Sequence, residues 1–128
     1  MSASGESFNA AAYFIERHLA DGRGAATAIE CDGQRISYNM LADGVGKVAS
    51  ALRSELSVRP EERVVLLMLD GPEMVYAFFG AIAIGAIPVP INTAWTAADV
   101  EFVLHDSRAG AVFVSGSLYP RVATVLRR

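Results

Sequence analysis

Glu101 and His105 form the residue pair whose types and spacing come nearest to a metal-binding arrangement. They stand four positions apart, the spacing that places two ligands on one face of a helix. A metal site needs at least a third ligand, and the sequence supplies none at a matching spacing. We therefore interpret the two residues as a solvated ion pair and assign no metal ligand.

Two glycine-containing segments share part of the pattern of a phosphate-binding loop. Gly44 to Val48 contains a Gly-Lys pair, but Leu41 stands where the motif needs another glycine, and Val48 where it needs Ser or Thr. Ser115-Gly116-Ser117 follows an expected strand, but the further glycines of an anion-binding loop are missing. The sequence predicts helix at the first segment and an ordinary strand-to-helix turn at the second.

Cys31 and His18 are the remaining side chains with catalytic chemistry, and neither has a partner in the sequence. Cys31 lies in an expected strand without a neighbouring histidine or cation, so we expect a half-buried structural thiol. His18 lies on the polar side of an expected helix, where a surface histidine is the simplest interpretation. We assign no catalytic residue to this chain.

Length and charge limit the class of protein. The chain has 128 residues, enough for a core of ordinary size, and 11 basic against 14 acidic residues give a net charge of -3. Without a basic cluster, nucleic-acid binding is not expected. Residues Met1 to Phe8 lack the pattern of a signal peptide, and the single cysteine cannot form an internal disulfide. Both observations predict a cytoplasmic protein.

The segment from Met74 to Ala98 carries no charged residue and is long enough to cross a bilayer as one helix. Gly85, Pro88 and Pro90 argue against a single helix, because glycine commonly ends helices and proline lacks the backbone donor. We predict a buried helix that begins at Pro72 and a buried strand after it, and we expect no membrane span.

The first half of the chain is predicted to hold two helices and a hairpin. Asn9 caps a helix that continues to Leu19, and Asp32-Gly33 joins strands at Thr27 to Cys31 and Gln34 to Tyr38. A second helix is expected from Met40 to Leu56, capped by Asn39. Because Gly44 and Gly46 lower helix stability, we expect another element to pack closely against both.

The second half predicts an α/β fold. Strand starts recur at Val64, Ile87 and Ala111, with helices between them from Pro72 to about Ile84 and from Asp99 to Asp106, the latter capped by Thr96. Runs without alternation indicate strands covered on both faces, hence a βαβαβ parallel sheet preceded by a helix and a β-hairpin. A last helix is expected at the C-terminal end of the chain.

Four segments resemble the N-terminal part of adenylate-forming acid-CoA ligases, with the first most similar to the benzoate-CoA ligase branch. They are Phe8 to Phe14, Ile36 to Leu41, Pro60 to Val64 and Gly80 to Asn92, in the order and spacing of that family. The resemblance implies a partial N-terminal subdomain of the ligase fold. Residues 1–128 would form the N-terminal portion of the large domain, with the rest of that domain and the C-terminal domain absent.

The resemblance also implies an activity for the parent protein. A carboxylate, expected to be aromatic and benzoate-like, would react with ATP in the presence of Mg²⁺, and CoA would then displace AMP. The family's phosphate-binding loop and catalytic lysine lie beyond this chain, so we expect it to be inactive alone. The alternatives are a non-catalytic α/β binding module of the same fold, or an unrelated doubly wound domain.

One partial site follows from the same resemblance. In relatives, the stretch after the strand that ends at Asn92, and a basic residue after the next strand, approach the nucleotide end of CoA. Here these positions are Asn92, Thr93, Ala94 and Trp95, and Arg121. Some relatives carry Arg at the position of Ala94, which puts that phosphate contact in doubt, and Arg121 is the candidate to replace it because a guanidinium suits a phosphate. Alternatively, Trp95 packs on the core and Arg121 is a solvated helix residue.

An unfinished sheet exposes an edge and an apolar face. We therefore expect self-association of the isolated chain or a homodimer of the parent protein.

Overall fold

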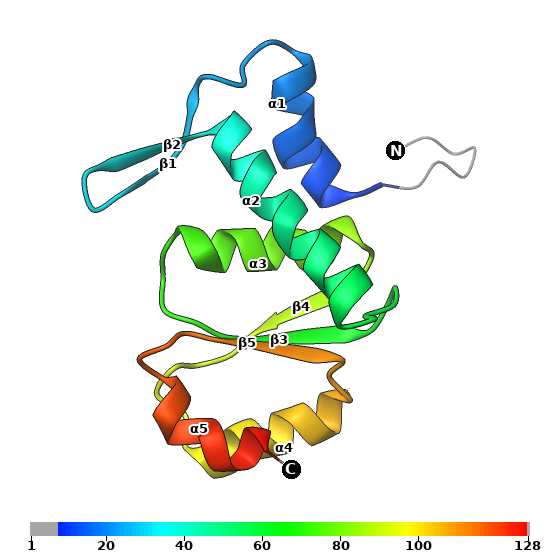
Figure 1. Cartoon of the computed structure of the whole chain (residues 1–128), viewed down its shortest axis with the longest axis vertical. Coiled ribbons are helices and arrows are strands. Elements are labelled where there is room, and N and C mark those ends of the chain that lie inside the picture. The colour runs from blue at the N-terminus through cyan, green and yellow to red at the C-terminus, as the bar shows by residue number, and fades with distance from the viewer. Residues whose placement is uncertain (1–7, 128) are drawn as a thin grey trace.

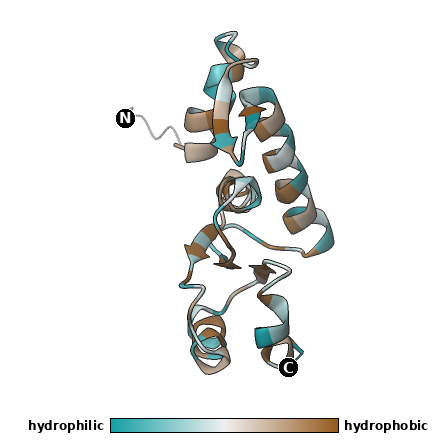
Figure 2. Ribbon diagram, turned by 90° about the vertical axis from the view of Figure 1, so that its left-hand side faces the viewer, coloured by the Kyte–Doolittle hydropathy of each residue, from teal (hydrophilic) through white to brown (hydrophobic). Residues whose placement is uncertain are grey.

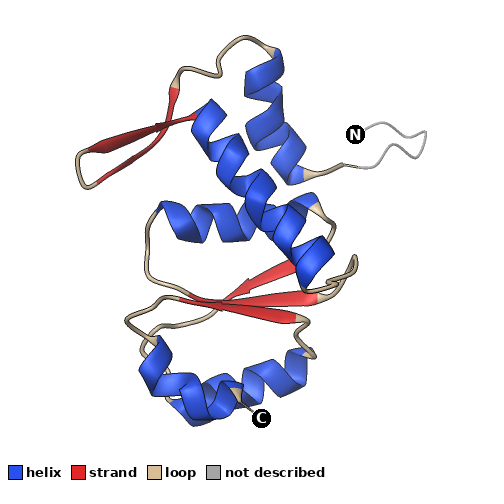
Figure 3. Cartoon of the chain, in the orientation of Figure 1, coloured by secondary structure: helices blue, strands red, loops and turns tan. Residues whose placement is uncertain are grey.

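The computed structural model describes residues 8–127 and has three layers (Figure 1). A parallel sheet of order β4-β3-β5 lies in the middle. Helices α2 and α3 lie on one face of it, and α4 and α5 on the other, as Figure 3 shows. The predicted α/β fold is thus confirmed. Its elements are β3 (Arg63–Leu67), α3 (Pro72–Ala83), β4 (Ile87–Pro90), α4 (Ala97–Ser107), β5 (Ala111–Val114) and α5 (Tyr119–Leu126).

The central strand β3 carries the core. Val64, Val65 and Leu66 have no exposed surface, and Leu67 is 1% exposed. Val64 and Leu66 pack against the α3 side of the sheet, whereas Leu67 packs against residues of α4 and α5. Figure 2 shows the hydrophobic colouring of the strands between the helices. A strand buried on both faces explains the continuous apolar run in the sequence.

Strand β4 ends the sheet on one side. The backbone N–H groups of Ile87 and Ile91 donate to Glu62 and Leu66 of the β3 segment. Backbone groups alternate in direction along a strand, so Pro88 and Pro90 occupy the outer positions. Proline has no N–H to donate there, which makes this edge a poor partner for another strand.

The segment without charged residues, Met74 to Ala98, contains most of a helix, a turn and a strand. Helix α3 starts at Pro72, Gly85 takes a positive φ of 81° after it, and β4 follows. Within residues 8–127, no helix is long and apolar enough to cross a membrane.

The N-terminal helix begins as the sequence predicts. Asn9 Oδ1 accepts hydrogen bonds from the N–H groups of Ala11 and Ala12, at 2.9 and 3.3 Å. The helix comprises a π-helical segment η1 (Ala12–Glu16) and α1 (Arg17–Ala20). It is followed by the antiparallel hairpin of β1 (Thr27–Cys31) and β2 (Gln34–Ser37), in which Asp32 and Gly33 both have positive φ.

The second helix starts earlier than predicted. Helix α2 covers Tyr38–Ser50 and continues as η2 (Ala51–Glu55). Its cap is Ser37, whose hydroxyl accepts from the N–H of Met40 at 3.2 Å, and the predicted cap Asn39 is wrong. Ser37 caps the helix because its backbone is extended, at φ -74° and ψ 165°, where the hairpin ends directly before the helix.

Helices α2 and α3 approach closely at two glycines. A Cβ on Gly80 would lie 2.5 Å from Val48 Cγ1, and one on Gly44 would lie 2.9 Å from the Tyr76 ring. The expectation of close packing at Gly46 is wrong, because nothing lies within 4 Å of a Cβ there. Gly46 instead borders a groove.

His18 is held in a small polar cluster. Its imidazole stacks on Tyr38 at 4.3 Å, and Arg23 Nε donates to its Nδ1 at 3.0 Å. Arg23 also pairs with Asp21 at 2.9 Å. Partial burial, followed by the charges of Arg23 and Arg17, lowers the pKa of His18, with Asp21 opposing.

We expect Gly80→Ala to destabilise the chain by about 1–3 kcal/mol, because the new methyl group forces α2 and α3 apart. Gly46→Ala is the matched control in the partner helix. It adds a methyl group in open space and should stabilise by about 0.5–1 kcal/mol through helix propensity. Urea denaturation followed by circular dichroism measures both free energies of unfolding. Equal effects of the two substitutions would contradict the close approach at Gly80.

The His18 cluster predicts a pH dependence. Because folding lowers the pKa of His18, the unfolded chain binds the proton more readily, and stability falls as the pH drops below about 6.5. NMR titration of the imidazole should give a midpoint below that of the urea-unfolded chain. Arg23→Ala removes the donor and the nearby charge, and should raise the midpoint. An unchanged midpoint in that variant would contradict the role of Arg23.

Candidate functional site

The carboxyl ends of the three parallel strands meet at one edge of the sheet. The segments that leave this edge are 68–71 after β3, 91–96 after β4 and 115–118 after β5. The connection through α3 covers one face and the connection through α4 covers the other (Figure 1). The chain goes from β3 to β4 on one side of the sheet and then returns past β3 to β5 on the other, so the strand order reverses between β3 and β5. Ligands of open α/β sheets bind beside such a point.

The segment 92–96 is held at both ends by local side-chain hydrogen bonds. Asn92 Oδ1 accepts from the N–H of Ala94 at 2.8 Å, which closes an Asx turn. Thr96 and Asp99 form a capping box at the start of α4, as the predicted cap requires. The two ends of this short segment therefore have defined shapes.

Arg121 links α5 to the middle of the same segment. Its Nη1 donates to the carbonyl oxygen of Thr93 at 2.6 Å and to that of Trp95 at 3.1 Å. The structure thus brings Thr93, Trp95 and Arg121 together from positions far apart in the sequence, with Asn92 at the start of the segment. Arg121 itself remains exposed to solvent.

The Trp95 side chain is half-buried at the edge of the hydrophobic cluster between the sheet, α4 and α5. It packs against the cluster formed by Leu67, Val100, Leu118 and Val122, which joins β3, α4 and α5. Side-chain packing and the Arg121 hydrogen bonds therefore hold the same residue to the same helix.

Ser115 joins the other two segments at this edge. Its hydroxyl accepts a hydrogen bond from the N–H of Leu69 at 2.9 Å, across 46 positions in sequence. Sequence reasoning treated Ser115 as part of an ordinary turn and missed this link. The local turn is present, since Leu118 N–H donates to Ser115 oxygen at 2.8 Å, but nothing in the sequence points to Leu69 as a partner.

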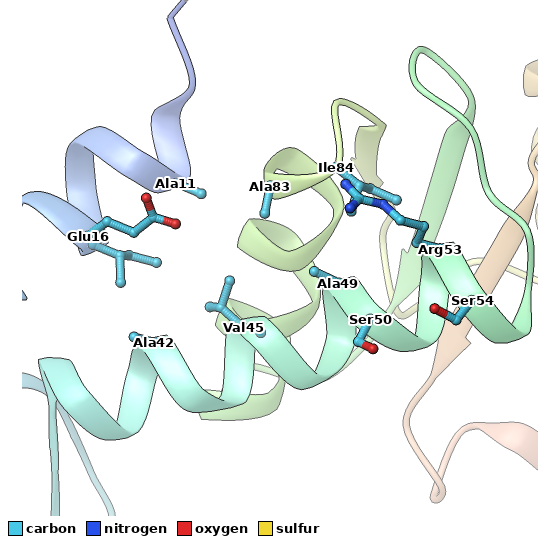
Figure 4. A pocket seen from close by; sticks show the side chains of 12 residues that line it. Ala11, Glu16, Ala42, Val45, Ala49, Ser50, Arg53, Ser54, Ala83 and Ile84 are labelled. Carbon is cyan, nitrogen blue, oxygen red and sulfur yellow. The ribbon is translucent and has the colours of Figure 1, made fainter.

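A groove lies on the face of the sheet that α2 and α3 cover, between the N-terminal helix, α2 and α3 (Figure 4). It encloses about 410 Å³ and is lined mostly by small or apolar residues, with Glu16 and Arg53 at its borders. Sequence reasoning missed it, although Ala42, Gly46 and Ala49 on one side of α2 are the small residues that leave the space open. Among the described residues, those that line it include no histidine, cysteine or aspartate.

The remaining sequence candidates are the potential metal ligands and Cys31. Residues 8–127 contain no group of three potential metal ligands among His, Cys, Asp and Glu side chains. Cys31 is half-buried, and burial together with the adjacent Asp32 carboxylate raises the pKa of its thiol. A thiol held in its protonated form is a poor nucleophile.

Comparison with protein families gives a match to the AMP-binding enzyme family over residues 16–127. The benzoate-CoA ligase of Thauera aromatica is 40% identical over 121 residues, which cover 94% of this chain and 23% of the relative. The chain thus spans about a quarter of the length of the curated relatives it matches.

Solved structures show the same relationship. A benzoate CoA ligase from Burkholderia xenovorans LB400 superposes with a TM-score of 0.86 at 40% identity, over 94% of this chain and 24% of that one. An anthranilate CoA ligase in complex with anthranoyl-AMP superposes with a TM-score of 0.87 at 32% identity, over 99% and 24%. The family match, the sequence identity and the shared fold agree, and the chain belongs to the AMP-binding enzyme family of adenylate-forming acid-CoA ligases, whose N-terminal subdomain it matches.

Proposed function

We propose that residues 1–128 are the N-terminal portion of the large domain of an ATP-dependent ligase that converts an aromatic carboxylate to its CoA thioester. The observation that carries this proposal is the 40% identity to a benzoate-CoA ligase over nearly the whole chain, combined with coverage of about a quarter of that relative. Relatives named for benzoate and for anthranilate support an aromatic acid as the substrate.

The chemistry of such a ligase requires more than this chain provides. Formation of an acyl-adenylate needs cationic groups around the transferred phosphoryl group, and Mg²⁺ that neutralises charge on the ATP phosphates. Arg121 is a cationic residue at the carboxyl edge of the sheet, but its Nη1 already donates hydrogen bonds to two carbonyl oxygens. We therefore propose that the chain alone is inactive, and that ATP and Mg²⁺ are bound elsewhere in the parent protein.

Within that function, we propose that Asn92, Thr93, Trp95 and Arg121 form a rim for the nucleotide end of CoA. They lie together at the carboxyl edge of a parallel sheet, where open α/β folds bind ligands. In this rim the segment 92–96 faces the nucleotide, and Arg121 holds the segment in place through its hydrogen bonds to Thr93 and Trp95.

The proposal is tested by assaying two proteins, the 128-residue chain and the longest product of the same reading frame. Each is incubated with ATP, Mg²⁺ and CoA, and with benzoate, 2-aminobenzoate or hexanoate, and the thioester and AMP are quantified. We expect no product from the chain alone, and aryl thioester with stoichiometric AMP from the longer protein. Thioester formation by the chain alone would refute its inactivity, and activity on hexanoate alone would refute the aromatic substrate.

We expect the isolated chain to self-associate through β5, because the proline edge of β4 is blocked and the other edge of β5 has no neighbouring strand within residues 8–127. Ala111→Pro removes an outward backbone donor, and should shift the sedimentation coefficient toward that of the monomer. Ile87→Lys on the proline edge is the control and should leave association unchanged. A chain that stays monomeric at all concentrations would contradict this expectation.

A further inference from the structure

We infer that Arg121 is a positioning residue, which fixes the shape of the segment 92–96 and does not itself contact the nucleotide. Its consequence for CoA binding rests on the proposed function, whereas its structural part concerns this chain alone. The inference starts from the two hydrogen bonds that one guanidinium nitrogen makes to Thr93 and Trp95.

The carbonyl oxygens of Thr93 and Trp95 both accept their hydrogen bonds from Arg121. It is the only donor that the described part of the chain brings to either oxygen. Hydrogen bonds from a charged donor are shorter and about twice as strong as neutral ones, which agrees with the 2.6 Å contact. The guanidinium therefore holds two backbone groups, two residues apart, in one orientation.

Besides the packing of the Trp95 side chain and a backbone hydrogen bond from Trp95 N–H to Asn92 oxygen, the other restraints on this segment act at its ends. The Asn92 Asx turn fixes the start, and the capping box of Thr96 and Asp99 fixes the end. Between them, the backbone oxygens have no other link to the body of the protein. Loss of the Arg121 side chain should therefore release the middle of the segment and leave α4 and the Asx turn in place.

A positioning role and a phosphate contact make different demands on the ligand-free protein. The hydrogen bonds of Arg121 join two parts of the chain itself, so a positioning residue affects the segment before CoA binds. A residue that only binds phosphate affects the protein once the phosphate is present. Nη1 already donates to both carbonyl groups, so a phosphate contact that leaves these hydrogen bonds in place has to use Nη2 or Nε.

Trp95 provides a direct measurement, because it is the single tryptophan of the chain. In Arg121→Ala and Arg121→Met we expect Trp95 emission to shift to longer wavelength and acrylamide quenching to increase. The Met variant keeps much of the length of the side chain and removes the donors. Arg127→Ala is the matched control, an exposed arginine at the end of the same helix that makes no side-chain hydrogen bond or ion pair with residues 8–127. It should leave the fluorescence unchanged.

The fluorescence experiment can overturn the inference in two ways. Unchanged Trp95 emission and quenching in Arg121→Ala would show that the hydrogen bonds do not order the segment. Wild-type behaviour of Arg121→Met would show that stem packing, and not hydrogen bonding, is responsible. Far-UV circular dichroism and the urea midpoint establish that each variant is folded.

The consequence for binding is measured in the ligase that carries this segment, with CoA and with 3′-dephospho-CoA as acceptors. We expect Arg121→Ala to raise KM for both acceptors by the same factor, about three- to tenfold, the value of one or two hydrogen bonds. ATP–pyrophosphate exchange, which precedes CoA binding, should stay at the wild-type rate.

The positioning role of Arg121 and the proposed ligase function are tested by separate results. A rise in KM confined to CoA would assign Arg121 to the 3′-phosphate and overturn the positioning role. Unchanged KM values alongside altered Trp95 fluorescence would overturn the consequence for CoA binding, while the ordering of the segment by Arg121 would stand. If the longer protein forms no CoA thioester, the proposed function fails, and the fluorescence result still decides whether Arg121 orders the segment.

Discussion

Complete burial of β3 decides where the helices of this fold must lie. Its residues Val64 to Leu67 lie between two helical layers, and each layer covers one face of the same short strand. A strand that hides both faces must have helices on both sides, so the chain has to cross the sheet through α3 on one face and α4 on the other. Because the three strands are parallel, the connecting segments that leave their carboxyl ends lie at one edge.

The two helical layers serve the fold in different ways. On one side, glycines let α2 and α3 approach closely, and the aromatic ring of Tyr76 and the side chain of Val48 fill the space that a methyl group would take. On the other side, α5 joins the edge segments. Ser115 before it binds Leu69, and Arg121 within it binds the segment after β4. The first layer is built for packing, and the second positions the backbone beside the strands.

Much of the fold was accessible from local sequence. Asp32-Gly33, Pro72 and Thr96 each act at short range through φ preference or a side-chain cap, and the structure has the hairpin and both helices where these residues predict them. The cap of α2 was missed because Ser37 and Asn39 are both good caps, and only the end of the hairpin decides between them. Gly46 was misjudged because a glycine that adjoins a groove has the same sequence signature as one under a neighbouring helix.

Sequence alone predicts the order of elements, the parallel sheet, the family and the candidate positions at the end of β4 and in α5. It does so because periodicity, turn residues and family motifs are properties of neighbouring residues. Only the tertiary structure decided that Arg121 reaches the carbonyl groups of Thr93 and Trp95, that Ser115 reaches Leu69, and that α2 borders an open groove. Such contacts join residues that the folded sheet brings side by side, and neither their partners nor their distances are encoded by spacing along the chain.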